Sequence, residues 1–262
     1  MVELRQPEIT STASERDAYN IIYEEIGVQQ SDSFYLWLLE LLNVRPNQTL
    51  LDISCGQGNL VRFAWERNIR AIGIDLSEVG LQIAMRQSGQ TSFAAADAQL
   101  LPVASHSFDF VTNIGSIEHY LDPAMGVQEI ARVLKPDGLA CILLPNTYSL
   151  LGNIKHVVQT GDVYQGFQPI ERYHTLNGWR RLLTENGLRP IKTVKYEKVS
   201  PRTSADTWWY LRHPPKLLHL LLTPLIPLAL ANCFVYLCRR QSDFDGDQDP
   251  KQLVNHHPEA HE

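Results

Sequence analysis

Short apolar stretches and amphipathic stretches alternate between residues 49 and 146, and this alternation limits the possible folds more than any other feature. The apolar stretches have the length of strands: "TLLDIS", "IRAIGIDL", "FDFVTNIG" and "LACILLPN". The stretches between them have helical periodicity: "NLVRFAWERN", "SEVGLQIAMRQ" and "DPAMGVQEIARVLKPDG", the last ending at Pro136 and Gly138. Strands separated by helices of this length predict an α/β fold, in which a parallel sheet is covered on both faces.

Polar residues stand where these predicted strands end, at Asp52, Asp75, Asp97 and Asn113. In open α/β sheets ligands bind beyond the carboxyl ends of the strands. The functional site is therefore expected at this edge of the sheet.

The first of these ends forms a glycine-rich turn, "LLDISCGQGNL", residues 50–60. A phosphate is a poor ligand for it, because no Gly-Lys-Ser/Thr follows and Val61 stands where a dinucleotide fingerprint has a small residue. Asp52 would repel a pyrophosphate but suits an ammonium or sulfonium group. Asp75 can accept hydrogen bonds from ribose hydroxyls, and Asp97 from the amine of adenine. These three demands together indicate S-adenosylmethionine (SAM), whereas an isolated glycine turn is about as often only packing.

Five segments occur in the order and spacing of the class I SAM-dependent methyltransferases: "LLDISCGQGNLVRFA", "AIGIDLS", "AAADAQLLPVASHSFDFV", "SIEHYLDP" and "IARVLKPDGLACILLPN". The chain most resembles the group that acts on small molecules, which includes quinone methyltransferases. The resemblance covers residues 45–146 and continues more weakly through "RYHTLNGWRRLLTENGLRP" and "FVYLCRR". It implies a doubly wound, Rossmann-like sheet of seven mostly parallel strands, and methyl transfer from SAM to a small acceptor, with hydrophobic molecules among the candidates.

The resemblance also implies roles for individual residues. Asp52, Gly56 and Gly58 match the motif around the methionine part of SAM. Asp75 matches the acidic ribose ligand with Leu76 beside the base, and Asp97 and Ala98 match the adenine contact. Ser54 stands where the family commonly has glycine. The residues predicted to bind the cofactor are Asp52, Ser54, Gly56, Gly58, Asp75, Leu76, Asp97, Ala98 and Asn113.

Methyl transfer needs a base only if the acceptor must lose a proton, since positioning alone supplies much of the barrier reduction. Glu118 and His119 follow the fourth strand end and are the candidate catalytic residues. The unperturbed pKa of histidine lies near the operating pH, which suits His119 as a general base. The alternative is that this stretch only caps the next helix and His119 points at solvent.

The organisation of the chain follows from these stretches. We expect an N-terminal helical cap at 1–48, a methyltransferase domain at 49–240, a lid at 146–174 and a disordered acidic tail at 241–262. Three residues in or near the lid are candidate substrate ligands: Tyr148, Arg172 and His174. The N-terminus lacks the apolar core of a signal peptide, which predicts a cytoplasmic protein.

An apolar stretch within an insertion at 200–231 has two readings. Residues 215–231 are too short to cross a bilayer and are interrupted by Pro224 and Pro227. We expect them to form core or a wall of the acceptor pocket, because a large apolar helix is usually buried. The alternative is peripheral contact with a membrane through 200–240, where five basic residues stand against one acidic residue, Asp206.

Other functional classes fit the sequence less well. The formal charge of −6 disfavours a nucleic-acid partner, and the four cysteines lack metal-site spacing, so no metal is expected. In the tail, Gln248 and Val254 occupy positions where a calcium loop needs glycine and glutamate. Two rivals remain. They are a protein that binds SAM without turnover and, less well supported, a dinucleotide-dependent oxidoreductase.

Overall fold

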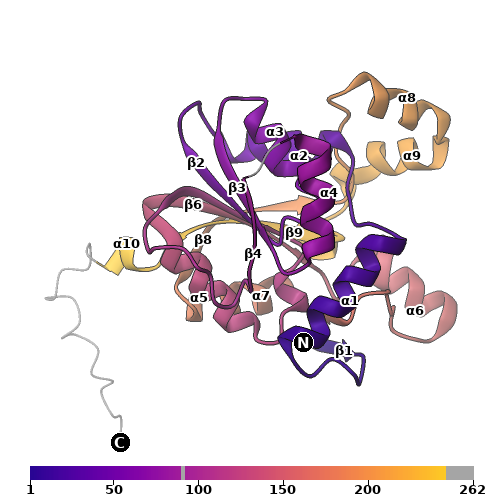
Figure 1. The fold of residues 1–262 in the computed structure, drawn as a ribbon. Coiled ribbons are helices and arrows are strands. Elements are labelled where there is room, and N and C mark those ends of the chain that lie inside the picture. Colours follow the sequence, from indigo (N-terminus) through magenta and orange to yellow (C-terminus); the bar gives the residue numbers. More distant parts are fainter. Residues whose placement is uncertain (90–91, 246–262) are drawn as a thin grey trace, which may run out of the picture.

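The computed structural model describes residues 1–89 and 92–245, and its centre is a seven-stranded sheet (Figure 1). The order across the sheet is β4-β3-β2-β5-β6-β9-β8. The strands are β2 (Thr49–Ile53), β3 (Arg70–Asp75), β4 (Phe93–Ala95), β5 (Phe108–Ile114), β6 (Leu134–Pro145), β8 (Leu188–Tyr196) and β9 (Cys233–Arg240). The pairs from β4 to β6 are parallel, and β9 is antiparallel to both of its neighbours. The predicted doubly wound, mostly parallel sheet is confirmed.

Helices cover both faces of the sheet (Figure 1). They are α2 (Asp32–Leu42), α3 (Asn59–Trp65), α4 (Glu78–Ser88), α5 (Pro123–Val133) and α7 (Leu176–Glu185). One apolar core forms beneath α5 and α7, and a second beneath α2 and α3. The predicted N-cap Ser77 accepts a hydrogen bond from the amide of Gly80. The helix predicted to reach Pro136 ends earlier, at Val133, because a proline disfavours helical backbone in the residue before it.

The N-terminal segment is not entirely helical as predicted. Before α1 (Thr12–Glu25) the chain forms a short strand, β1 (Val2–Arg5). This strand pairs antiparallel with β7 (Ile170–Tyr173) in a separate two-stranded sheet. The predicted lid, 146–174, contains β7 together with a π-helical turn η2 (Leu150–Ile154) and α6 (Lys155–Thr160). The start of the chain and the predicted lid segment, 146–174, are therefore joined by backbone pairing.

The insertion at 200–231 folds as a helical hairpin at the periphery (Figure 1). It consists of α8 (Ser204–Arg212), α9 (Pro214–Leu222) and two 3₁₀ turns, η3 (Thr223–Leu225) and η4 (Leu228–Leu230). The expectation that this stretch is core is wrong for α9, none of whose residues is buried. Among residues 1–89 and 92–245, no helix combines the length and apolar character that crossing a bilayer requires.

The predicted acidic tail, 241–262, begins with one short helix, α10 (Ser242–Asp245). The rest of that prediction lies outside the described residues.

Candidate functional site

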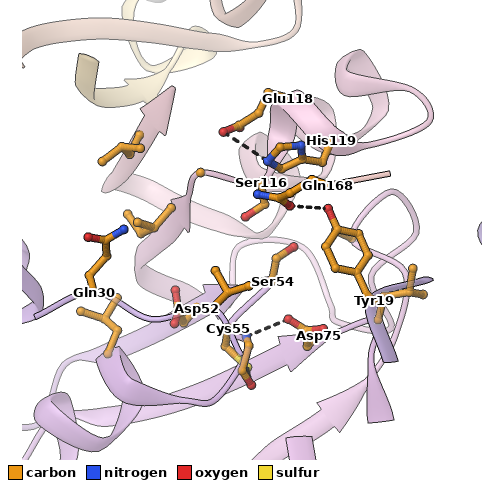
Figure 2. A pocket seen from close by; sticks show the side chains of 18 of the residues that line it. Tyr19, Gln30, Asp52, Ser54, Cys55, Asp75, Ser116, Glu118, His119 and Gln168 are labelled. Carbon is orange, nitrogen blue, oxygen red and sulfur yellow. Dashed lines mark hydrogen bonds and ion pairs between the residues drawn. The ribbon is translucent and has the colours of Figure 1, made fainter. Parts of the chain in front are cut away.

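A cavity of about 310 Å³ lies at the carboxyl ends of the central strands (Figure 2). In the sheet, β3 and β4 lie on one side of β2, and β5 and β6 lie on its other side, so the direction in which strands are added reverses between β2 and β5. Open α/β sheets bind ligands at such a reversal. The cavity is lined by nine of the predicted site residues: Asp52, Ser54, Gly56, Asp75, Leu76, Asp97, Ala98, Glu118 and His119. The lining does not include five others: Gly58, Asn113, Tyr148, Arg172 and His174.

The glycine-rich turn has left-handed backbone at Ser54, Gly56 and Gly58, with φ of 59°, 53° and 70°. Glycine adopts this conformation freely, whereas a residue with a Cβ pays for it in steric strain. The Ser54 hydroxyl lies 2.8 Å from the hydroxyl of Tyr120, a hydrogen bond that glycine could not make. The departure from the family's glycine therefore exchanges backbone freedom for a polar contact across the cavity.

Asn113 supports this contact from outside the cavity. Its amide nitrogen donates to the Tyr120 hydroxyl at 2.6 Å, and its oxygen accepts from the Ile117 amide at 3.2 Å. The second bond ties the end of β5 to the 3₁₀ turn η1 (Ile117–His119). Asn113 thereby positions the turn that carries Glu118 and His119.

Two buried carboxylates form the acidic wall of the cavity. Asp75 accepts from the amides of Gly56 at 2.7 Å and Ser77 at 2.8 Å, which fixes the glycine-rich turn against β3. Asp52 accepts from the Thr112 hydroxyl at 2.6 Å. Burial raises the pKa of Asp52 to about 7 and that of Asp75 to about 6. Within the described chain neither carboxylate forms an ion pair, so a cationic ligand would relieve their desolvation.

The third strand end carries a more open carboxylate. Asp97 accepts from the backbone amide of Gln99 at 2.8 Å and from its side-chain amide at 3.0 Å. Its other oxygen accepts from the hydroxyl of Thr12, at the start of α1, at 3.1 Å. Asp97 is therefore held by two segments that are far apart in the sequence.

Glu118 and His119 are both buried, so the alternative in which His119 points at solvent is wrong. His119 Nδ1 donates to the Ile170 carbonyl, which leaves Nε2 as a lone pair 3.7 Å from Glu118 Oε1 (Figure 2). Burial lowers the pKa of His119 to about 4 and raises that of Glu118 to about 8. The group whose pKa lies near neutrality is thus Glu118, not His119 as the sequence suggested. The second oxygen of Glu118, Oε2, has no hydrogen-bond partner.

The predicted substrate ligands lie elsewhere. The buried Arg172 donates to Glu3 Oε2 at 2.7 Å and to the backbone carbonyls of Glu118 and Tyr120, so it holds the η1 turn in place. Tyr148 is 55 % exposed. His174 rests edge-on against the Trp179 ring, with centroids 5.6 Å apart.

Comparison with known proteins identifies the family of the domain. The methyltransferase domain family matches residues 51–142. A SAM-dependent methyltransferase from Thermotoga maritima has the same fold, with a TM-score of 0.55 and 18 % identity over 85 % of this chain and 94 % of its own. Residues 51–142 of the chain therefore form a methyltransferase domain, in a chain with the fold of a SAM-dependent methyltransferase. SAM is its cofactor.

Two curated relatives of the methyltransferase act on oxygen according to their names. This chain is 27 % identical over 201 residues to the ubiquinone biosynthesis O-methyltransferase of Alkalilimnicola ehrlichii, and the match covers 68 % of this chain and 79 % of the relative. It is 29 % identical over 164 residues to the 27-O-demethylrifamycin SV methyltransferase of Amycolatopsis mediterranei, covering 58 % of each. With the rifamycin enzyme and three further curated relatives, the chain spans only about half of the relative's length, between 40 % and 58 %.

The site also contains residues that the sequence analysis missed. Glu15, Tyr19 and Tyr23 line the cavity from α1, and their spacing of four residues places them on one helix face. That spacing was the signal available in the sequence. Tyr19 donates to Gln168 Oε1 at 2.9 Å, which joins α1 to the lid (Figure 2). Glu15 is buried with Oε2 unpartnered, and burial raises its pKa to about 7.

The residues present fit the cofactor. The acidic wall suits the cationic part of SAM, and the unpartnered oxygen of Glu15 lacks the donor that a hydroxyl or amine would provide. At Gly56 a Cβ would lie 2.6 Å from the Tyr23 hydroxyl, so only glycine lets α1 close over the turn.

Gly56→Ala in the methyltransferase is expected to weaken SAM binding at least tenfold and to destabilise the fold by about 2–3 kcal/mol, because backbone strain and overpacking add. Gly89→Ala is the matched control, since Gly89 has a φ of 64° but no atom within 4 Å of its Cβ position. The control should lose about 1–2 kcal/mol and keep its SAM affinity. Thermal unfolding and calorimetry with SAM measure both. Equal losses in the two variants would show that the contact with Tyr23 contributes nothing.

Proposed function

We propose that this methyltransferase transfers the methyl group of SAM to a hydroxyl of a small hydrophobic acceptor. The observation that carries the proposal is the composition of the cavity. Its acidic wall, Asp52 and Asp75, is joined to an apolar wall, with the unpaired carboxyl of Glu118 in the same lining. The apolar wall consists of Phe34, Leu60, Ile114, Leu143 and Tyr196.

At the cofactor end we assign each acidic residue one task. Asp75 accepts from the ribose hydroxyls while its present bonds hold the turn, and Asp97 accepts from the adenine amine. Asp52 stabilises the positive charge of the methionine part. SAM supplies the methyl group already activated on a sulfonium, so the protein's work is positioning and charge stabilisation.

At the acceptor end we assign Glu118 as the general base. Its Oε2 takes the proton as the acceptor oxygen forms its bond to the methyl carbon. His119 lies beside Glu118, with Nε2 3.7 Å from Oε1, and its bond from Nδ1 to the Ile170 carbonyl fixes the imidazole ring against that carboxyl. Arg172 holds the backbone of the same turn.

Two arguments support oxygen as the methylated atom. The names of the two relatives described above both specify methylation at oxygen. A hydroxyl must lose its proton on methylation, and the cavity lining provides a buried carboxyl suited to accept it.

The test is to incubate the protein with methyl-labelled SAM and a detergent extract of membranes, and then to partition the products between organic solvent and water. We expect label in the organic phase, with the NMR shift of a methoxy group. Label on nitrogen or in the aqueous phase would overturn the acceptor assignment. SAM retention without labelled product would favour the rival in which SAM is bound without turnover.

A further inference from the structure

The α8–α9 hairpin exposes an unusual amount of apolar surface. Seven large side chains within eighteen residues are exposed, from 42 % at Leu222 to 77 % at Leu225. We call these seven the hairpin surface: Trp208, Trp209, Leu211, Leu218, Leu221, Leu222 and Leu225. Single exposed leucines are ordinary, but a contiguous group of this kind marks an interaction surface.

The hairpin is fixed to the domain by polar contacts on its inner side. Lys195 Nζ donates to the carbonyls of residues 223, 224 and 226 at 2.8, 3.0 and 2.7 Å. His219 Nε2 lies 2.9 Å from the carboxylate of the buried Glu197. Asp206 accepts from the backbone amide of Ser33 at 2.9 Å. These contacts hold the polar side of the hairpin against the domain, so its exposed apolar side chains face away from the domain.

The charge around this surface is positive although the whole chain carries −6. Arg212 and Lys216 are exposed, and neither forms an ion pair with any described residue. The one acidic residue of 200–240, Asp206, is engaged with Ser33. Unpaired cationic side chains beside apolar side chains complement an anionic lipid membrane, which has negative headgroups at its surface and hydrocarbon beneath them.

A shallow groove on α8 adds a second observation. It has a volume of about 440 Å³ and is lined by Ala205, Trp208, Trp209, Arg212 and His213. The rings of Trp209 and His213 stack 4.4 Å apart beside the guanidinium. Tryptophan is enriched at the interface of a bilayer, and arginine binds phosphate oxygens, so the groove combines the two chemistries of a phospholipid headgroup region.

The hairpin is connected to the acceptor end of the cavity. Glu197, which contacts His219, also accepts from the backbone amide of Asn232 at 2.5 Å. Asn232 and the following Cys233 line the cavity. Asn146, at the start of the lid, donates to the carbonyls of residues 229 and 231. In Figure 1 the hairpin lies at the upper right of the molecule and α6 at the lower right.

We propose that the hairpin surface docks the protein on an anionic lipid membrane, with α8 and α9 lying in the interface. A helix of nine residues such as α9 is about 14 Å long, which suits interfacial contact and not a span. Docking would bring to the bilayer the hairpin that contacts the cavity lining through Glu197 and Asn232. The idea that the membrane supplies the acceptor rests on the proposed function. The docking itself does not depend on that function.

The test is flotation of the purified protein with phosphatidylcholine vesicles, with and without phosphatidylglycerol. We expect binding to the anionic vesicles at low salt. Two variants, Leu221→Glu with Leu225→Glu and Arg212→Glu with Lys216→Glu, should each reduce binding at least tenfold. Leu100→Glu is the matched control, because Leu100 is 76 % exposed and lies outside the hairpin. SAM affinity by calorimetry should be unchanged in all of them.

Three outcomes would overturn the proposal. One is protein that stays in solution with both vesicles, and another is equal binding to neutral and anionic vesicles. The third is a concentration-dependent dimer in light scattering that the leucine variant abolishes, because the surface would then serve a second copy. None of these readouts requires turnover, so a failed methylation assay leaves the vesicle result interpretable.

Discussion

Glu118→Gln is expected to lower kcat by about 10²–10⁴-fold while SAM affinity stays near that of the wild type. Glutamine has nearly the same shape but cannot accept the acceptor's proton. The η1 turn should keep its conformation, because Arg172 and Asn113 bind backbone atoms of the turn and do not bind the Glu118 carboxyl. Single-turnover rates with the labelled acceptor, and calorimetry with SAM, separate the two quantities.

The pH profile distinguishes Glu118 from His119 as the base. A base must be unprotonated, and burial raises the pKa of Glu118 to about 8, so kcat should rise with pH, reach half its maximum near pH 8 and level off above it. Burial lowers the pKa of His119 to about 4, so a reaction dependent on His119 would be flat above pH 5. Glu118→Gln should abolish the rise, and Glu118→Asp should retain part of it. A flat wild-type profile, or full activity in the glutamine variant, would leave positioning as the source of catalysis.

The raised pKa of Glu118 also makes the free energy of unfolding depend on pH. The folded protein holds the Glu118 proton up to about pH 8, whereas the unfolded chain releases it near its ordinary value of 4.5. The folded state therefore binds more protons in this window, and the free energy of unfolding falls as pH rises through it. Glu118→Gln removes the share of this dependence that Glu118 contributes, while Glu15, Asp52 and Asp75, whose pKa values burial also raises, keep theirs.

The sheet and the acidic wall could be predicted because their signals are local. Strand length, helix periodicity and the polar residue at each strand end are all written in consecutive residues, and parallel strands bring those ends together. Asp52, Asp75 and Asp97 therefore line the cavity as expected. The last strand, β9, followed from the resemblance and not from pattern, and its antiparallel direction was not predicted.

The rest depends on tertiary placement. β1 and β7 are four residues each and separated by more than 160 positions, so neither carries a strand signal of its own. The pKa of His119 is set by burial beneath a carbonyl of β7, which the sequence does not reveal. The hydropathy of the sequence identified the apolar stretch that forms α9, but it does not show which face of the helix the domain covers.

Asp75→Ala is expected to raise the Kd for SAM by about 10–100-fold, since a hydrogen bond to a charged group contributes about 1.5–3 kcal/mol. The change also frees the amides of Gly56 and Ser77, so lost affinity alone has two explanations. Asp75→Asn retains an acceptor for one of these amides but lacks the charge. Unchanged affinity in the alanine variant would remove the ribose assignment.

A double-mutant cycle separates the ribose contact from the collapse of the turn. The affinities of wild type and Asp75→Ala are measured for S-adenosylhomocysteine and for its 2′-deoxy analogue. If Asp75 binds the 2′-hydroxyl, removing the hydroxyl should cost the wild type severalfold more affinity than the variant, because the coupling isolates the pair. If Asp75 acts only by holding the turn, both proteins should lose the same factor. Additive losses would therefore make Asp75 a positioning residue, and the ribose would need another partner among the cavity residues, of which the unpaired Glu15 is the first to test.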